Sequence, residues 1–123
     1  MKVFVSSVIL GFEAEREAAA RGACTLDHEV KRAEDFNATS ASPQATCLAG
    51  VRWADAVVLL LGRRYGDVQS SGLSATHEEY REARNRCDVL AFIQTGIERE
   101  AKQDAFVKEV QDYTQGIFTR GFA

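Results

Sequence analysis

The sequence has few of the residues that hold small disulfide-rich or metal-dependent domains together. Its three cysteines, Cys24, Cys47 and Cys87, are widely spaced and form no CxxC pair, and His28 and His77 have no partner at metal-ligand spacing. An odd, scattered set of cysteines is typical of reduced thiols rather than of a disulfide framework or a metal site. We therefore expect a cytosolic protein without a structural metal.

Long apolar runs and an excess of positive charge are also absent. The longest apolar run, ADAVVLLLG, is shorter than the ~18 residues of a membrane span, and the apolar start, VFVSSVIL, is too short and too interrupted for a signal peptide. The formal net charge is -3 and the pI is about 5.4. We therefore expect no membrane association and no direct nucleic-acid binding.

The 123 residues, 46% of them apolar, are enough for one domain, residues 1–123, with its own core. Strand-like and helix-like segments alternate, which predicts an α/β fold with a parallel sheet and helices on both faces. The run AVVLLL is apolar throughout, as in a central strand, and favours a flavodoxin-like, doubly wound order 2-1-3-4-5. The predicted strands are 2–5, 28–32, 56–61, 89–93 and 117–122; the predicted helices are 11–22, one from 43, 76–86 and 98–113. Since no helix closes the last strand, we expect the N-terminal part of a longer polypeptide.

Ligands of such sheets bind beyond the carboxyl ends of the strands, near the point where the strand order reverses. This rule selects Ser6 and Ser7 after the first strand, and Asp35 and Phe36 after the second. The two serines could present hydroxyl and N–H groups to a phosphate or ribose. They could equally well only terminate a strand.

The same rule selects the turn GRRYGD after the third strand. Gly62 permits close backbone approach, Arg64 suits a phosphate or carboxylate, and the ring of Tyr65 can stack on a base. A basic turn after a buried strand is also common as a solvated loop, and GRRYGD is not a phosphate-binding P-loop.

Glu79 lies in the stretch SATHEEYREA, at the start of a predicted helix. If Ser74 or Thr76 caps the helix, Glu79 falls in its first turn, where the helix dipole favours a carboxylate. Thr76 and Glu79 also fit the capping-box spacing, so Glu79 could serve only to close the helix start. The alternative is a carboxylate directed into a substrate pocket. Spacing alone does not separate the two, and the lack of a histidine partner argues against a Ser-His-Asp or Cys-His hydrolase.

Several stretches, in order, resemble the domain of unknown function 4062 family. They are MKVFVSS, FEAEREAA, AEDF, SPQATCL, ADAVVLLLGRRYGD, SGLSATHEEYREA and KQDAFVKEVQDY, and they cover nearly the whole chain. The most specific are the G-x-R-Y-G turn and the S-x-T-x-x-E-Y-x-x-A helix start. The resemblance implies kinship with TIR domains and nucleoside deoxyribosyltransferases, which share the flavodoxin-like sheet.

Deoxyribosyltransferase-like proteins carry the pattern [ST]-x-x-E-I-G-x-A, whose glutamate is the nucleophile. Thr76, Glu79 and Ala83 fall on this pattern, whereas Tyr80 and Arg81 replace the I-G pair. The resemblance therefore implies a catalytic role for Glu79 and a place for Thr76 beside the substrate. The departures put the contacts to the ribose in question.

The resemblance further implies a TIR-like effector domain of a bacterial antiphage defence receptor, ahead of a STAND-type NTPase and sensor region. Its activity would be hydrolysis of the N-glycosidic bond of NAD⁺ or a related nucleotide after self-association, with NAD⁺ as substrate and no cofactor. Glu79 would be nucleophile or charge stabiliser, and we expect the helix start to keep its pKa low. The rival function is a non-catalytic signalling module that self-associates or binds a partner.

Overall fold

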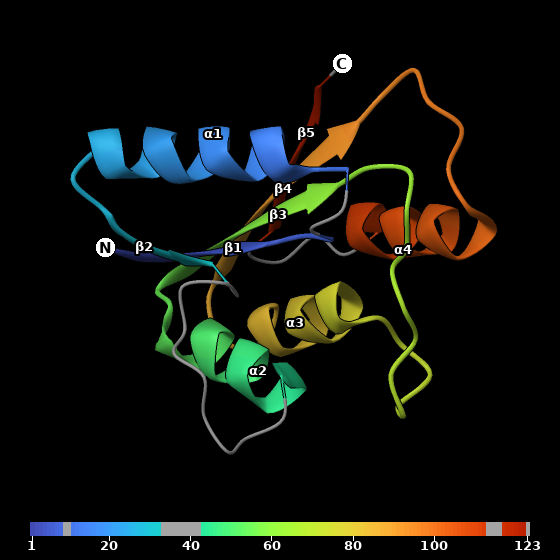
Figure 1. The fold of residues 1–123 in the computed structure, drawn as a ribbon, viewed down its shortest axis with the longest axis horizontal. Coiled ribbons are helices and arrows are strands. Elements are labelled where there is room, and N and C mark those ends of the chain that lie inside the picture. The colour runs from blue at the N-terminus through green and yellow to red at the C-terminus, as the bar shows by residue number, and fades with distance from the viewer. Residues whose placement is uncertain (9–10, 33–42, 113–116, 123) are drawn as a thin grey trace.

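The computed structural model describes residues 1–8, 11–32, 43–112 and 117–122, with the backbone alone at 43–47 and 117–119. It contains a parallel five-stranded sheet of order β2-β1-β3-β4-β5, which confirms the predicted α/β, flavodoxin-like topology (Figure 1). The strands are β1 (Lys2–Ser6), β2 (Glu29–Arg32), β3 (Ala56–Leu61), β4 (Asp88–Gln94) and β5 (Ile117–Phe122); the helices are α1 (Glu13–Thr25), α2 (Pro43–Trp53), α3 (Ala75–Ala83) and α4 (Ala101–Asp112).

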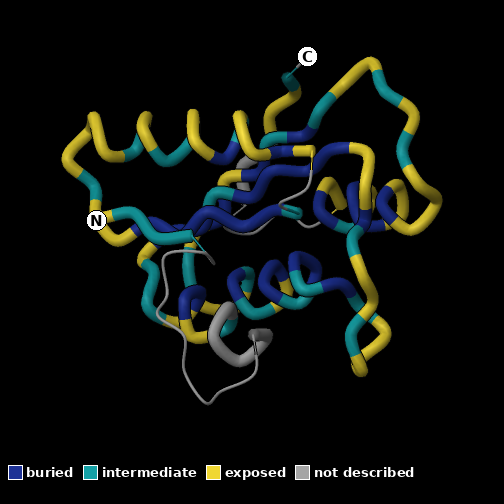
Figure 2. Tube along the Cα trace, in the orientation of Figure 1, coloured by how far each residue is buried: buried dark blue, intermediate teal, exposed yellow. Residues whose placement is uncertain are grey.

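Helices cover both faces of the sheet unequally. α1 lies on one face, and α2, α3 and α4 lie on the other (Figure 1). The larger core cluster joins alternate residues of β3, Val57, Leu59 and Leu61, to Tyr80 of α3 and Phe106 of α4. A smaller cluster lies under α1. Most of the core therefore lies between the sheet and helices α3 and α4. Figure 2 shows that the central strands are buried.

The central place of β3 in the sheet follows from its side chains, which are apolar on both faces. Val57, Leu59 and Leu61 enter the larger cluster, whereas Leu60 belongs to the smaller one and Val58 packs against it. β3 pairs with β1 on one side and β4 on the other. The point where the strand order reverses therefore lies between β1 and β3.

Helix α1 extends further than predicted. Gly22, the last residue of the predicted helix, lies inside α1, which ends at Thr25 with Leu26 as C-cap. The left-handed residue that turns the chain is Asp27, with φ of 61°. Aspartate tolerates this conformation better than most residues, so the glycine was not needed there.

Candidate functional site

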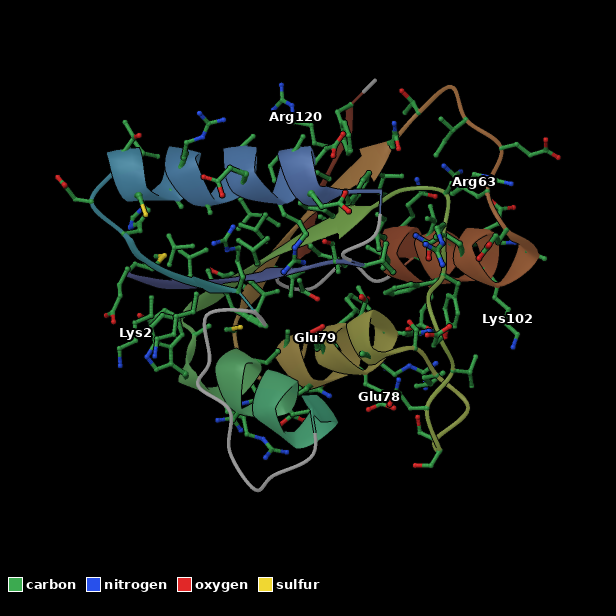
Figure 3. The ribbon with its side chains drawn as sticks, viewed as in Figure 1. Lys2, Arg63, Glu78, Glu79, Lys102 and Arg120 are labelled. Atoms are coloured by element: carbon green, nitrogen blue, oxygen red, sulfur yellow. The ribbon has the colours of Figure 1, made fainter. Side chains whose placement is uncertain are left out.

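The centre of the site is a contact between the end of β1 and helix α3. The hydroxyl of Ser6, the last residue of β1, donates a 3.1 Å hydrogen bond to Oε1 of Glu79. Ser6 is 1% exposed and Glu79 is 4% exposed. In Figure 3, Glu79 lies on the side of α3 that faces the sheet, and Glu78 lies on the outer side. Glu79 therefore lies beside the tip of the first strand, in a buried contact rather than an open cleft.

The start of α3 shows that Glu79 does not cap the helix. Ser74 is the N-cap, and its side chain accepts a hydrogen bond of 3.2 Å from the backbone N–H of His77. The capping-box interpretation of Thr76 with Glu79 is therefore wrong, because the helix begins two residues earlier than that box requires. Thr76, 5% exposed, lies on the buried side of α3 together with Glu79. The carboxylate is thus not used to close the helix.

Burial dominates the electrostatics of Glu79. It raises the pKa of this carboxyl to about 8; the Ser6 hydrogen bond and the charge of Arg16 oppose the rise, and Glu78 adds to it. The expectation of a carboxylate kept ionised by the helix start is wrong for this state, since desolvation outweighs the other effects. At neutral pH most Glu79 side chains are protonated. Oε2 is buried and has no hydrogen-bond partner among the described residues.

Ser7 is held by a residue that sequence analysis did not select. Nη1 of Arg16, on α1, donates to the backbone oxygen of Ser7 at 3.1 Å and to its Oγ at 2.8 Å. Arg16 is only 2% exposed. It stands among the acidic and alanine residues of α1, where a charged side chain normally faces solvent, so the sequence contains no signal for its burial. The hydroxyl of Ser7 itself donates to the carbonyl of Val8.

The predicted turn residues separate into buried and exposed members. Gly62 packs so closely that a Cβ there would lie 2.6 Å from Cζ of Phe12. Tyr65 is 5% exposed, and its backbone N–H donates to the Glu100 carboxylate at 2.9 Å. Its ring is therefore not available to stack on a base in this state. Arg64 is exposed.

Tyr65 belongs to a buried polar chain that crosses the larger core. Its hydroxyl lies 2.6 Å from Nδ1 of His77, and Nε2 of His77 lies 3.1 Å from both oxygens of Glu109 on α4. The His77 ring stacks on Phe106 with centroids 4.0 Å apart. Burial lowers the pKa of His77, against the opposing effect of Glu109. Glu109 was not selected from the sequence, because its partners are about 30 residues away and only the fold brings them together.

A hollow of about 210 Å³ lies at the carboxyl edge of the sheet. It is formed where β1, β3 and β4 end, and Glu79 and Ser6 do not line it. Its walls and rim include Val8, Phe12, Gly62, Arg63, Arg64 and Gln94. The structure thus brings Gly62 and Arg64 to one hollow and Ser6 and Glu79 to a buried contact nearby.

A larger pocket of about 580 Å³ lies beside α1 on the opposite side from α3. It is lined mainly by apolar side chains such as Leu60, Leu90 and Phe92. Among its described lining residues, Glu15 and His28 are the only polar side chains, fewer than the convergent set that usually orients a small substrate. We therefore place no chemistry there.

The remaining predictions fall outside these contacts. Asp35 and Phe36 lie outside the described residues. In the described ranges, no three histidine, cysteine or acidic side chains gather in a way that could hold a metal ion. No described helix combines the length and apolar composition required to cross a bilayer.

Comparison with known proteins identifies the family. The family model described as domain of unknown function (DUF4062) matches residues 2–123. Among curated proteins, none matches the chain in sequence. A match over nearly the whole chain is decisive, and the protein belongs to the DUF4062 family.

Proposed function

We propose that the domain hydrolyses the N-glycosidic bond of NAD⁺ or a related nucleotide, with Glu79 as nucleophile or charge stabiliser. The observation that carries the proposal is the pairing of Glu79 with Ser6 beside the point where the strand order reverses. Crevices at this point are the usual ligand sites of doubly wound sheets. A buried carboxyl with a strongly raised pKa is also more typical of functional sites than of solvated helix surfaces.

The chemistry needs only one well-placed carboxylate. Cleavage of the bond between ribose and nicotinamide develops positive charge at the anomeric carbon, which a carboxylate beneath the sugar stabilises or attacks. The nicotinamide already carries positive charge, so it leaves without a general acid. Ser6 would hold Glu79 in place, and Thr76 would border it on the same side of α3.

The protonated, buried Glu79 describes a resting state in this proposal. A cationic substrate beside the carboxyl would favour its ionised form and lower its pKa. Entry requires the contact between β1 and α3 to open, because Glu79 is 4% exposed. We propose that self-association drives this opening, so that the isolated domain stays inactive.

The biological setting proposed with this activity is that of an effector in a cytoplasmic antiphage receptor. The support is the resemblance of the sequence to domains that precede STAND-type NTPases. The NTPase and sensor region of the same polypeptide would then control assembly.

A non-catalytic signalling module is the second candidate. The burial of Glu79 favours it, since no described pocket reaches the carboxylate. In this case the contact between Ser6 and Glu79 would stabilise the fold, and self-association alone would transmit the signal.

Measured NAD⁺ consumption by the assembled full-length protein separates the two candidates. We compare wild type with Glu79→Gln and, as a matched control on the same helix, Glu78→Gln. Loss of an electrostatic stabiliser at the reacting carbon typically costs about 10²–10³-fold in rate, so Glu79→Gln should lose that much and Glu78→Gln little. If the wild-type protein assembles but mass spectrometry detects no turnover of NAD⁺ or other nucleotides, only the signalling module remains.

A further inference from the structure

The hollow of about 210 Å³ at the carboxyl edge of the sheet has the size of one chemical group. Val8 follows β1, Gly62 follows β3 and Gln94 ends β4, so three strand ends surround it. Pockets that enclose a whole drug-sized ligand usually measure about 300–1,000 Å³. The hollow is therefore suited to part of a ligand, with the rest extending outside.

The charged side chains of its lining are both positive. Arg63 and Arg64 have no hydrogen-bond or ion-pair partner for their guanidinium groups in the described ranges, and no acidic side chain lines the hollow. Figure 3 shows Arg63 on the loop after β3, above α4. Several other arginines pair with acids, as in Arg32–Glu17, Arg52–Glu82 and Arg81–Glu109. Two adjacent unpaired guanidiniums in a chain of net charge -3 attract an anion at this point.

The floor of the hollow is shaped for close approach. A Cβ at Gly62 would lie 2.6 Å from Cζ of Phe12 and 3.1 Å from Oε1 of Gln94, so only glycine fits. Gln94, half-buried over this floor, places its Oε1 near Gly62; its amide has no side-chain hydrogen bond to a described residue, so its NH2 group remains free to donate. Donors from a planar amide and two guanidiniums match the several acceptor oxygens of a phosphate.

We propose that the hollow bounded by Arg63, Arg64, Gly62 and Gln94 binds the phosphate groups of a phosphorylated nucleoside. The inference deepens the proposed function and rests on it only for the nucleoside part of the ligand. The segment Ser6–Val8 joins the two places, since Ser6 contacts Glu79 and Val8 lines the hollow. Phosphates held in the hollow would leave the attached ribose at the end of β1.

Calorimetric binding to the 123-residue chain tests the proposal with three probes, ADP-ribose, inorganic pyrophosphate and adenosine. The variants are Arg63→Gln and Arg64→Gln, with Arg86→Gln, at an exposed arginine in the turn after α3, as the matched control. We expect ADP-ribose and pyrophosphate to bind, each hollow variant to weaken both by about 5- to 10-fold, as for partly exposed charged hydrogen bonds, and Arg86→Gln to change neither. Adenosine should bind far more weakly than ADP-ribose, with no dependence on Arg63 or Arg64.

Three outcomes would overturn the inference: equal affinity in the hollow variants and the control, adenosine binding as tightly as ADP-ribose, or pyrophosphate binding without ADP-ribose binding. Glu79→Gln keeps this test separate from the proposed function, because Glu79 does not line the hollow. Pyrophosphate carries no ribose that could reach Glu79, so its affinity should be unchanged in that variant. Arginine-dependent binding without turnover would remove the enzyme and keep the phosphate site. Turnover without arginine-dependent binding would support the enzyme and rule out the phosphate site.

Discussion

The side chains of Ser6 and Glu79, 73 positions apart in the chain, meet in a buried hydrogen bond between the end of β1 and α3. Ser6 Oγ is the described partner of Oε1, and Oε2 of the same carboxyl has no described partner. A buried acid satisfied on one side only costs free energy of folding. The fold retains this cost at the place where doubly wound sheets bind ligands. Four substitutions test the contact between Ser6 and Glu79 and the residues around it.

Ser6→Ala should destabilise the domain by about 1–3 kcal/mol, because it leaves Oε1 of Glu79 buried without a donor. Urea denaturation measures the free energy of unfolding. In the double variant with Glu79→Met, which removes the acceptor, the cost of Ser6→Ala should be smaller, since the two side chains interact directly. Strictly additive effects would mean that the hydrogen bond contributes nothing to the stability.

Glu79→Gln should alter the dependence of stability on pH. The pKa of Glu79 is about 8 in the folded chain and about 4.5 in the unfolded chain, so the unfolded state releases its proton first. The stability from the neutral, buried acid is full below pH 4.5 and is lost as pH rises through 8, by about 1.4 kcal/mol per pH unit between these values. The amide variant lacks this loss, and its unfolding free energy should gain on the wild type across that window. Parallel curves for the two proteins, measured by urea denaturation at several pH values, would contradict the burial described here.

Tyr65→Phe should destabilise the domain by about 1–3 kcal/mol, although it removes one atom only. The Tyr65 hydroxyl lies 2.6 Å from Nδ1 of His77, and the backbone N–H of Ser74 donates to it at 3.3 Å. Both groups are buried and would lose a partner. Urea denaturation provides the measurement, and a change below 0.5 kcal/mol, within the usual range for surface substitutions, would show that the chain through His77 is not important for stability.

Gly62→Ala should destabilise the domain by about 1–3 kcal/mol, because the new Cβ would lie 2.6 Å from Cζ of Phe12 and the core would have to shift. Gly22→Ala is the matched control. Gly22 lies inside α1 with nothing within 4 Å of the added Cβ, so alanine should stabilise by about 0.5–1 kcal/mol. Thermal unfolding of both variants checks the opposite signs.

The fold was predictable because its strongest signals are local. The run Ala56–Leu61 has the observed bounds of β3, since an apolar segment in both directions fits only the centre of a parallel sheet. Helix ends were less predictable. Ser74 and Thr76 are both good caps by residue type, and only packing decides that Ser74 is used.

The contact between Ser6 and Glu79 was predictable from chain order, but its burial was not. The topology rule selected Ser6, and the sequence pattern selected Glu79, because both depend on order along the chain. Burial and partner choice depend on contacts between distant segments. For this reason Arg16 and Glu109 were missed, and Tyr65 proved to be a core residue rather than an exposed ring.

The two hydrogen bonds from Arg16 to Ser7 make the tip of β1 and the first turns of α1 one mechanical unit. A ligand that displaced the backbone at Ser7 would have to carry α1 along or break both bonds. Helix α1 covers one face of the sheet, so such a shift would change the shape of the protein surface there (Figure 1). A partner bound to the outer surface of α1 would thereby sense ligand binding at the end of β1.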